Sequence, residues 1–198
     1  MSSAQKRRVQ IRQAILDGAI REFARNGLSG TSTQALADAA GLTKAQLHYY
    51  ITTKEDLYDE ALRSIVGEWR HIFFVSAGPE DPATVISSYI ERKINHALDY
   101  PEVSRLFANE VGRGATVLSR YWGELKTSVD EATAVIEGWI AAGQIRPVDP
   151  LLFQMNMWAV TQHYAEYEAQ ARHLLGTDAG LPLDRDRIIR EAQETFLL

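Results

Sequence analysis

Apolar residues recur every three to four positions along most of the chain, which is the period of an amphipathic helix. In the first such segment, residues 9–27, the apolar positions are four apart: Ile11, Ile15, Ala19 and Phe23. Asn26 and Gly27 follow, and both residue types tolerate the left-handed backbone of a helix C-cap. The pattern therefore predicts a first helix that ends near residue 27.

Two short helices around a tight turn are predicted over residues 33–51. Gly41 interrupts the apolar pattern and suits the left-handed position of such a turn. Thr43 can cap the helix that follows, in which Leu47 and Ile51 are four apart and face a core. A small three-helix unit is therefore expected at the N-terminal end of the chain.

Longer helices account for the remainder. One begins at a threonine cap, Thr52 or Thr53, and stops in the Gly- and Pro-containing stretch 76–83. No stretch alternates in the manner of a strand, so we expect an all-α fold of about nine helices. Gly- and Pro-containing breaks separate the remaining helices, which are expected at about 83–99, 101–111, 115–142, 150–175 and 184–197.

Charge divides the chain more sharply than hydropathy does. The 198 residues carry a net charge of −5, but residues 1–55 hold eight Lys and Arg against four Asp and Glu. The remainder holds 13 basic and 22 acidic residues. A basic head on an acidic body points to a polyanionic partner for the head alone. We therefore predict a DNA-binding domain over residues 1–54 and a second domain over residues 55–198.

Several classes of protein lack support in the sequence. No apolar run reaches about 18 residues, and the basic N-terminus lacks the apolar segment of a secretory signal, so no membrane partner and a cytoplasmic location are expected. With no cysteine there is no disulfide or thiolate metal site. No nucleophile elbow, HExxH or phosphate loop is present, and the single Glu-x-x-His at Glu68–His71 is half of what a di-iron bundle needs. We expect no enzyme, metal or cofactor.

A helix, a glycine turn and a second helix on a basic unit form the helix-turn-helix arrangement, whose second helix enters the major groove of double-stranded DNA. The exposed positions of that helix are expected to face base edges, and a glutamine there matches adenine: Lys44, Ala45, Gln46 and His48. Hydroxyls, helix N-termini and an ammonium at the caps and flanks are expected to meet phosphates: Thr31, Ser32, Thr33, Thr43, Tyr49, Tyr50 and Lys54.

The span from Gln10 to Leu57, ending in LHYYITTKEDL, resembles the DNA-binding head of the TetR family of bacterial transcriptional regulators. It departs from the usual pattern at Ile51, where Phe is common, and at Thr52-Thr53, where Pro or Gly followed by Ser is common. The resemblance implies a homodimer, joined mostly through its last two helices, that reads a palindromic operator. It also implies a C-terminal domain that binds a small-molecule effector.

A narrower resemblance lies between Tyr89 and Tyr167. The segments YIERKINHALDYPEVSRLFANE, IEGWIAAGQIRPVDP and MWAVTQHYAEY are similar to the regulatory domain of the pyrimidine-utilisation repressor subgroup, whereas GRGAT around Arg113 is not. Effectors of that subgroup are pyrimidine bases such as uracil. The resemblance thus implies a repressor released by a small planar effector. The alternative is a DNA-binding regulator with no small-molecule effector.

A planar heterocycle with adjacent C=O and N–H groups needs aromatic walls and a group that can donate and accept hydrogen bonds. Such residues occur in pairs four apart, on single helix faces: Trp69 with Phe73, Arg105 with Asn109, and Trp158 with Gln162. These six are the predicted ligand-binding residues. Two alternatives stay open, because the tryptophans also suit a core or dimer interface and Arg105 also suits a pair with Glu102 or Glu110.

Overall fold

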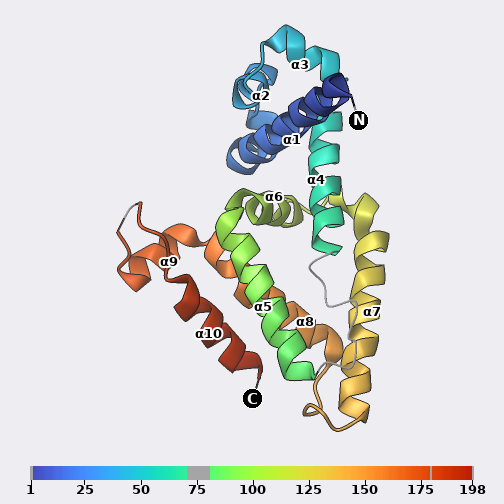
Figure 1. The fold of residues 1–198 in the computed structure, drawn as a ribbon, viewed down its shortest axis with the longest axis vertical. Helices are drawn as coiled ribbons and strands as arrows, with labels where there is room; N and C mark the ends of the chain where they lie inside the picture. Colours follow the sequence, from blue (N-terminus) through green and yellow to red (C-terminus); the bar gives the residue numbers. More distant parts are fainter. Residues whose placement is uncertain (1, 71–80, 179, 198) are drawn as a thin grey trace. The chain divides into compact units, whose positions relative to one another are not determined.

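The structure is a computed structural model that describes residues 2–70, 81–178 and 180–197 (Figure 1). These residues contain ten α-helices, one 3₁₀ turn and no strand, so the predicted all-α fold is confirmed. Phe73 lies outside the described residues. The elements are α1 (Ser3–Gly30), α2 (Thr33–Ala39), α3 (Lys44–Tyr50), α4 (Lys54–Arg70), α5 (Pro82–Asp99), α6 (Pro101–Gly112), η1 (Leu118–Tyr121), α7 (Trp122–Ala141), α8 (Pro150–Glu166), α9 (Glu168–Leu175) and α10 (Arg185–Phe196).

The chain divides into two compact units. The first unit contains Met1–Val66 and Arg105–Tyr121, and the second contains Gly67–Ser104 and Trp122–Leu198. Two of the three divisions fall inside helices, α4 and α6, so each of these helices contributes residues to both units, and the third falls between η1 and α7. The boundary expected between residues 54 and 55 stays a prediction.

The first unit is built around α1, with α2 packed on α1 and α3 packed on α2. Gly27 leaves the helical path of α1 at φ 66° and ψ 175°, where the sequence predicted the end of the first helix, but helical structure resumes and α1 continues to Gly30. The Phe23 ring is fully buried and meets the ring of Tyr58 on α4 edge to face, with centroids 5.0 Å apart. This contact joins the helix-turn-helix to α4 through one aromatic core.

The second unit has its core where α5 packs against α8 and α10, with α7 also against α8 (Figure 1). Apolar residues of all four helices supply this core, including Tyr89, Ile90, Ile136, Met157 and Ile188. Asp81 and Asp149 each accept hydrogen bonds from the first backbone N–H groups of α5 and α8, ahead of a proline at the first helical position. The breaks predicted from proline thus coincide with well-capped helix starts.

Two segments that the sequence predicted as single helices are divided. The segment 115–142 contains η1 followed by α7, and the segment 150–175 contains α8 followed by α9. The second division falls at Tyr167, at φ −114° and ψ 33°, and accounts for the tenth helix. The Tyr167 ring stacks on His163 with centroids 5.2 Å apart. Neither Gly nor Pro marks this position, which is why the sequence pattern missed the break.

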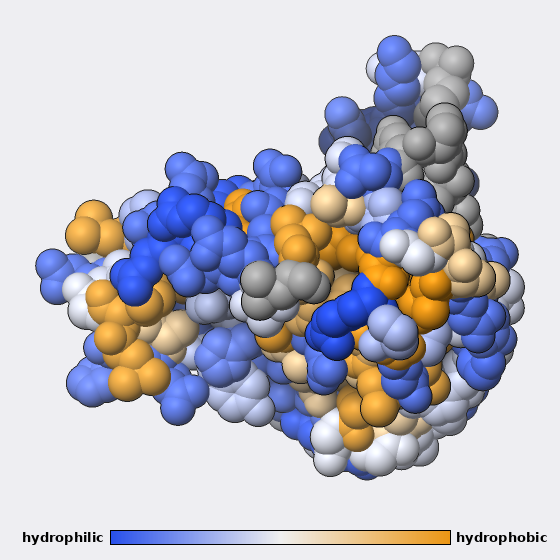
Figure 2. Space-filling view, turned by 90° about the horizontal axis from the view of Figure 1, so that it is seen from below, coloured by the Kyte–Doolittle hydropathy of each residue, from blue (hydrophilic) through white to orange (hydrophobic). Residues whose placement is uncertain are grey.

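Some apolar side chains of the second unit stay exposed, and apolar patches stand between hydrophilic residues on the face drawn in Figure 2. No helix among the described residues is long and apolar enough to cross a membrane. The exposed apolar residues of α8 and of the chain's C-terminal end are Leu151, Leu152, Met155 and Leu197. An apolar surface of this kind needs a partner to remove it from water.

Candidate DNA interface and ligand site

The N-terminus of α3 is fixed by a reciprocal capping box. The Thr43 hydroxyl accepts a hydrogen bond from the Gln46 backbone N–H at 3.2 Å, and the Gln46 Oε1 accepts one from the Thr43 backbone N–H at 2.9 Å. Leu47 is fully buried and holds the helix on the unit. Lys44, Ala45 and His48 are exposed on the other side. The helix is therefore anchored through Leu47 and exposes Lys44, Ala45 and His48 to solvent.

Gln46 is exposed, but its amide oxygen is already engaged. Besides the backbone N–H of Thr43, Oε1 accepts the Thr43 hydroxyl proton at 3.1 Å. A carbonyl oxygen has two lone pairs, so both are in use, while the two Nε2 donors take no part in the cap. In this conformation Gln46 can donate to a base, whereas the bidentate match to adenine requires the cap to open.

The residues expected at phosphates differ in exposure. Ser32 is exposed and caps α2 by accepting from the Ala35 N–H at 3.0 Å. Thr31 is only 2% exposed and its hydroxyl donates to the Gly27 carbonyl at 2.7 Å, so we correct the expectation that its side chain faces DNA. The Lys54 ammonium donates to the Thr31 carbonyl at 2.9 Å, which ties α4 to this loop.

The paired tyrosines at the end of α3 also differ. Tyr49 is 78% exposed, whereas Tyr50 is half-buried, and the two rings meet edge to face with centroids 5.2 Å apart. The Tyr50 carbonyl accepts a hydrogen bond from Arg12 on α1, and the Arg12 Nε donates to Glu60 on α4 at 3.1 Å. Arg12 therefore links the end of α3 to both α1 and α4.

Thr33, another residue expected at phosphates, is half-buried at the start of α2.

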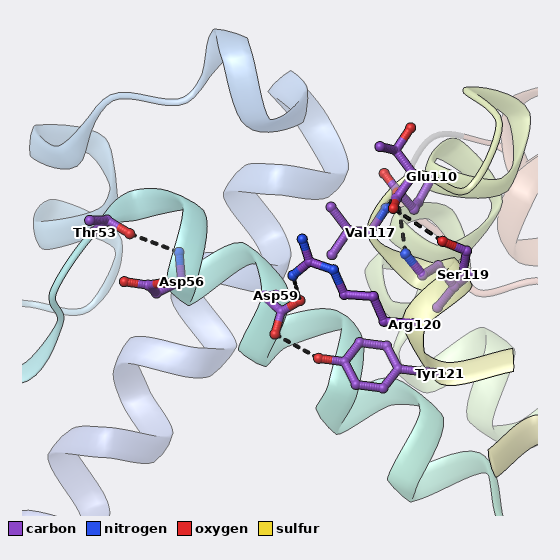
Figure 3. A network of polar contacts seen from close by, with 10 residues as sticks. Thr53, Asp56, Asp59, Glu110, Val117, Ser119, Arg120 and Tyr121 are labelled. Atoms are coloured by element: carbon purple, nitrogen blue, oxygen red, sulfur yellow. Dashed lines mark hydrogen bonds and ion pairs between the residues drawn. The ribbon is translucent and has the colours of Figure 1, made fainter. Parts of the chain in front are cut away.

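A buried carboxylate joins α4 to the end of α6 within the first unit. The Tyr58 hydroxyl donates to Glu110 Oε2 at 2.8 Å. Glu110 Oε1 accepts from the backbone N–H of Val117 at 2.7 Å (Figure 3). Glu110 is 5% exposed. Burial, followed by the hydrogen bond to this carboxylate, raises the pKa of Tyr58 well above its usual value, so the phenol stays a donor.

A second polar group lies one residue further along α4. Asp59 accepts a hydrogen bond from the Tyr121 hydroxyl at 2.6 Å and forms an ion pair with Arg120 at 3.0 Å, both in η1 (Figure 3). Burial, and then the bond to Asp59, raises the pKa of Tyr121 to about 12. Tyr58 and Asp59 together therefore hold the segment after α6 against α4.

The second unit buries a cation. Lys93 on α5 is 6% exposed, and its ammonium lies over the ring of Trp69 on α4, 4.2 Å from the centroid. Burial lowers the pKa of Lys93 to about 8, and the charge of Glu166 on α8 opposes that change. Burial raises the pKa of Glu166, and Lys93 lowers it in turn. The two charges are therefore close enough to affect each other inside the unit.

Tyr89 lies one turn before Lys93 on α5 and is buried beside α8. The Trp158 indole N–H donates a hydrogen bond to the Tyr89 hydroxyl, and burial raises the pKa of Tyr89 well above its usual value. Trp158, Gln162 and Glu166 follow at four-residue intervals and share a face of α8. We call Trp69, Tyr89, Lys93, Trp158 and Glu166 the Lys93 cluster.

The Lys93 cluster offers hydrogen-bonding groups that the fold leaves unused. Among the described residues, none accepts a hydrogen bond from the Lys93 ammonium or forms an ion pair with it within 4 Å. An ammonium carries three donors, and burying it without acceptors is costly. The cluster can thus give a donor from Lys93, over the Trp69 ring, and an acceptor from Glu166. In the part of the chain that the structure covers, no group of three or more His, Asp or Glu could hold a metal ion.

The sequence matches two family profiles. Residues 15–61 match "Bacterial regulatory proteins, tetR family", and residues 62–195 match "YcdC-like protein, C-terminal region". The HTH-type transcriptional regulator RutR of Escherichia coli is 38% identical over 168 residues, covering 83% of this chain and 78% of RutR. The chain belongs to the TetR family.

A further relative and two solved structures are also similar to this chain. The HTH-type transcriptional repressor KstR2 of Rhodococcus jostii is 33% identical over 147 residues, 68% of each chain. AibR, solved in complex with isovaleryl coenzyme A and operator DNA, superimposes with a TM-score of 0.71 at 19% identity over 94% of this chain and 97% of AibR. KstR2 of Mycobacterium tuberculosis superimposes at 0.73 and 19% identity, over 94% and 92%. These structures share the fold.

As a TetR-family member, the protein is a transcriptional regulator with a DNA-binding domain, and its relatives' names describe regulators and not enzymes. The histidine of the lone Glu-x-x-His, His71, lies outside the described residues. The glutamate of this motif, Glu68, hydrogen-bonds His96 of α5 at 3.1 Å, which lowers the pKa of Glu68.

The predicted ligand residues fall into separate units. Trp69, Trp158 and Gln162 belong to the second unit, whereas Arg105 and Asn109 belong to the first. The Asn109 amide donates to the Ala24 carbonyl of α1 at 3.0 Å, so we leave it out of the ligand site.

Lys93, Tyr89 and Glu166 were missed by sequence reasoning. A signal was present, because Lys93 lies at four-residue spacing between buried Tyr89 and Ala97 on α5.

Proposed function

We propose that this protein is a sequence-specific, homodimeric repressor that leaves its operator when the second unit binds a small planar effector. The single observation that carries the DNA-binding half is the capped and anchored α3, with Lys44, Ala45, Gln46 and His48 exposed. The dimer sets two such helices about 34–36 Å apart, so that each reads half of a palindrome. The exposed apolar residues of α8 and of the C-terminal end support the dimer.

Selection of bound sites from random DNA tests the DNA-binding half and should return a palindrome. Gln46→Ala and Lys44→Ala are expected to relax base preference at a symmetric pair of positions, at about 1–3 kcal/mol for each good contact. Lys126→Ala, at an exposed lysine of α7, removes an equal charge far along the chain and is the matched control. Unchanged base preference in Gln46→Ala would remove Gln46 from the set of reading residues.

The effector site is proposed at the Lys93 cluster together with Gln162. Trp69 and Trp158 supply aromatic walls, Lys93 a donor, Glu166 an acceptor and Gln162 both. A planar ring with adjacent C=O and N–H groups can pair with these donors and acceptors. A simple carboxylate would instead be repelled by the negative charge of Glu166. The likeness to the pyrimidine-utilisation subgroup supports a pyrimidine-like ring as the first compound to test.

Binding of uracil and related bases is measured by calorimetry and by thermal shift of the whole protein. Lys93→Met is expected to abolish binding, and Arg92→Met, an exposed neighbour on α5, is expected to retain it. Effector and operator should compete in fluorescence anisotropy, because an effector that prefers one state of the protein shifts the population away from the other. Equal operator affinity with and without bound effector would refute release.

α4 and α6 are the proposed route of release, because each contributes residues to both units. An effector-induced displacement of Trp69, near the end of α4, would also displace Tyr58 and Asp59, which lie on the same helix. The second candidate, a regulator without effector, predicts no specific stabilisation by any member of a small-molecule library. The unused donors of the buried Lys93 favour the first candidate.

A further inference from the structure

The first turns of α1 form a groove with the end of α3, and the α1 side of this groove is not among the predicted DNA contacts. The groove has a volume of about 640 Å³ and lies within the first unit. Its lining is shared between α1 and the paired tyrosines: Gln5, Arg8, Val9, Arg12, Tyr49 and Tyr50. The family profile matches only from residue 15, so the α1 side of this groove lies outside the matched region.

The α1 wall of the groove is basic, and apolar surface lies on both walls. Arg8 is exposed, and no carboxylate among the described residues pairs with it. The first acidic residue of the chain is Asp17, so residues 1–16 carry only positive side-chain charges. Val9 and Tyr49 are 57% and 78% exposed and form the apolar surface. A free guanidinium beside apolar surface suits a phosphate with its adjoining sugar.

The walls of the groove are held in position by Arg12. Its guanidinium donates hydrogen bonds to the Tyr50 carbonyl on α3 and to the carboxylate of Glu60 on α4. Arg12 therefore joins the α1 wall to the α3 wall directly. The N-terminal end of α1 is itself capped, because Ser2 and Gln5 form a capping box. Arg8 is therefore presented from a regular helix next to Tyr49, and not from a loose terminal arm.

We propose that this groove binds the sugar–phosphate backbone of DNA directly beside the half-site read by α3, with Arg8 as the phosphate-binding residue. The inference rests on the proposed DNA-binding function and extends it to residues 5–9. With α3 in the major groove of DNA, as proposed above, Tyr49 at the end of α3 contacts one DNA strand. The same strand then continues past Arg8, which lines the same protein groove as Tyr49. The contact adds affinity and salt dependence without sequence preference.

The helix itself provides the matched control. With 3.6 residues per turn, Gln5, Arg8, Val9 and Arg12 share one face of α1, and Arg7 points about 150° away from its centre. Arg7→Ala and Arg8→Ala therefore remove equal charge from adjacent residues that point about 100° apart, and only Arg8 lies on the groove face. Both side chains are exposed, so neither change should alter the thermal unfolding midpoint.

The experiment measures the affinity of the whole protein for DNA by fluorescence anisotropy at 50–200 mM KCl. Arg8→Ala is expected to reduce the slope of log K against log salt by about 0.9 per bound subunit. The wild type should then lose about threefold more affinity per subunit than Arg8→Ala across that range. Arg7→Ala should keep the wild-type slope, and base preference should be unchanged in both.

Two results would overturn the inference: an unchanged slope in Arg8→Ala, or an equal loss in Arg7→Ala and Arg8→Ala, which would indicate general attraction by the basic terminus. The same slopes measured on random DNA separate this inference from the proposed function. A wild type without sequence preference would overturn sequence-specific regulation, yet the difference between the two arginine variants would still report on the groove.

Discussion

Lys93 should cost the protein stability in the absence of a ligand, so Lys93→Met is expected to stabilise it. A pKa lowered from 10.5 to about 8 corresponds to about 3 kcal/mol in favour of the neutral amine in the folded state. The Trp69 ring offsets about 0.5–2 kcal/mol of this by holding the cation over its face. Methionine fills a similar volume without charge. We therefore expect Lys93→Met to raise the free energy of unfolding at pH 7 by about 1–3 kcal/mol.

The sign of the pH dependence follows from the lowered pKa. Below pH 8 Lys93 is protonated in both states, and the full cost of the buried cation is present. Between about pH 8 and 10.5 the unfolded chain binds more protons than the folded one, so the stability of the wild type rises with pH. The advantage of Lys93→Met is therefore largest at pH 7 and shrinks by pH 9.5.

Urea denaturation at pH 7.0 and pH 9.5, followed by tryptophan fluorescence, measures both quantities. Arg92→Met on the exposed face of α5 is the control and should change stability by no more than about 0.5 kcal/mol. A Lys93→Met protein less stable than the wild type at pH 7, or a difference that does not narrow at pH 9.5, would refute the reasoning.

Further predictions concern the first unit. Tyr58→Phe should destabilise it by about 1–3 kcal/mol, because Glu110 loses a buried donor, and urea denaturation measures this loss. A neutral effect would show that Glu110 finds another donor. Gly27→Ala should cost about 1–3 kcal/mol, since only glycine adopts φ 66° with ψ 175° without strain. The added Cβ would also lie 2.6 Å from the Arg113 guanidinium. If Gly27→Ala lowers the melting temperature equally in the wild type and in Arg113→Ala, backbone strain alone explains the loss.

Local features of the head could be predicted from the sequence because neighbouring residues determine them. Gly41 adopts φ 69° at the turn, and Thr43 caps α3, as expected from residue type and spacing alone. The division of α8 from α9 at Tyr167 could not be predicted, because a ring stack and not a helix-breaking residue marks it.

The proposed ligand site could be predicted from the sequence only in part, since it depends on which helices meet. Spacing correctly grouped Trp158 with Gln162 on one helix face. It could not reveal that Asn109 bonds α1 or that Glu166 faces α5, because both depend on long-range packing. Lysine is usually a surface residue, and only the four-residue spacing of Lys93 from buried residues of α5 indicates that it is buried.

The carbonyl of Ala24 in α1 is satisfied by Asn109, a residue 85 positions later, and Phe23 packs on Tyr58 beyond the predicted domain boundary. The DNA-reading part is thus not a detachable module. A fragment that stops after residue 54 would expose Phe23 and lack the α6 residues that complete its fold. Limited proteolysis should accordingly release no stable N-terminal fragment of that size, and grafting this head onto another body would require residues 55–66 and 105–121 to be carried with it.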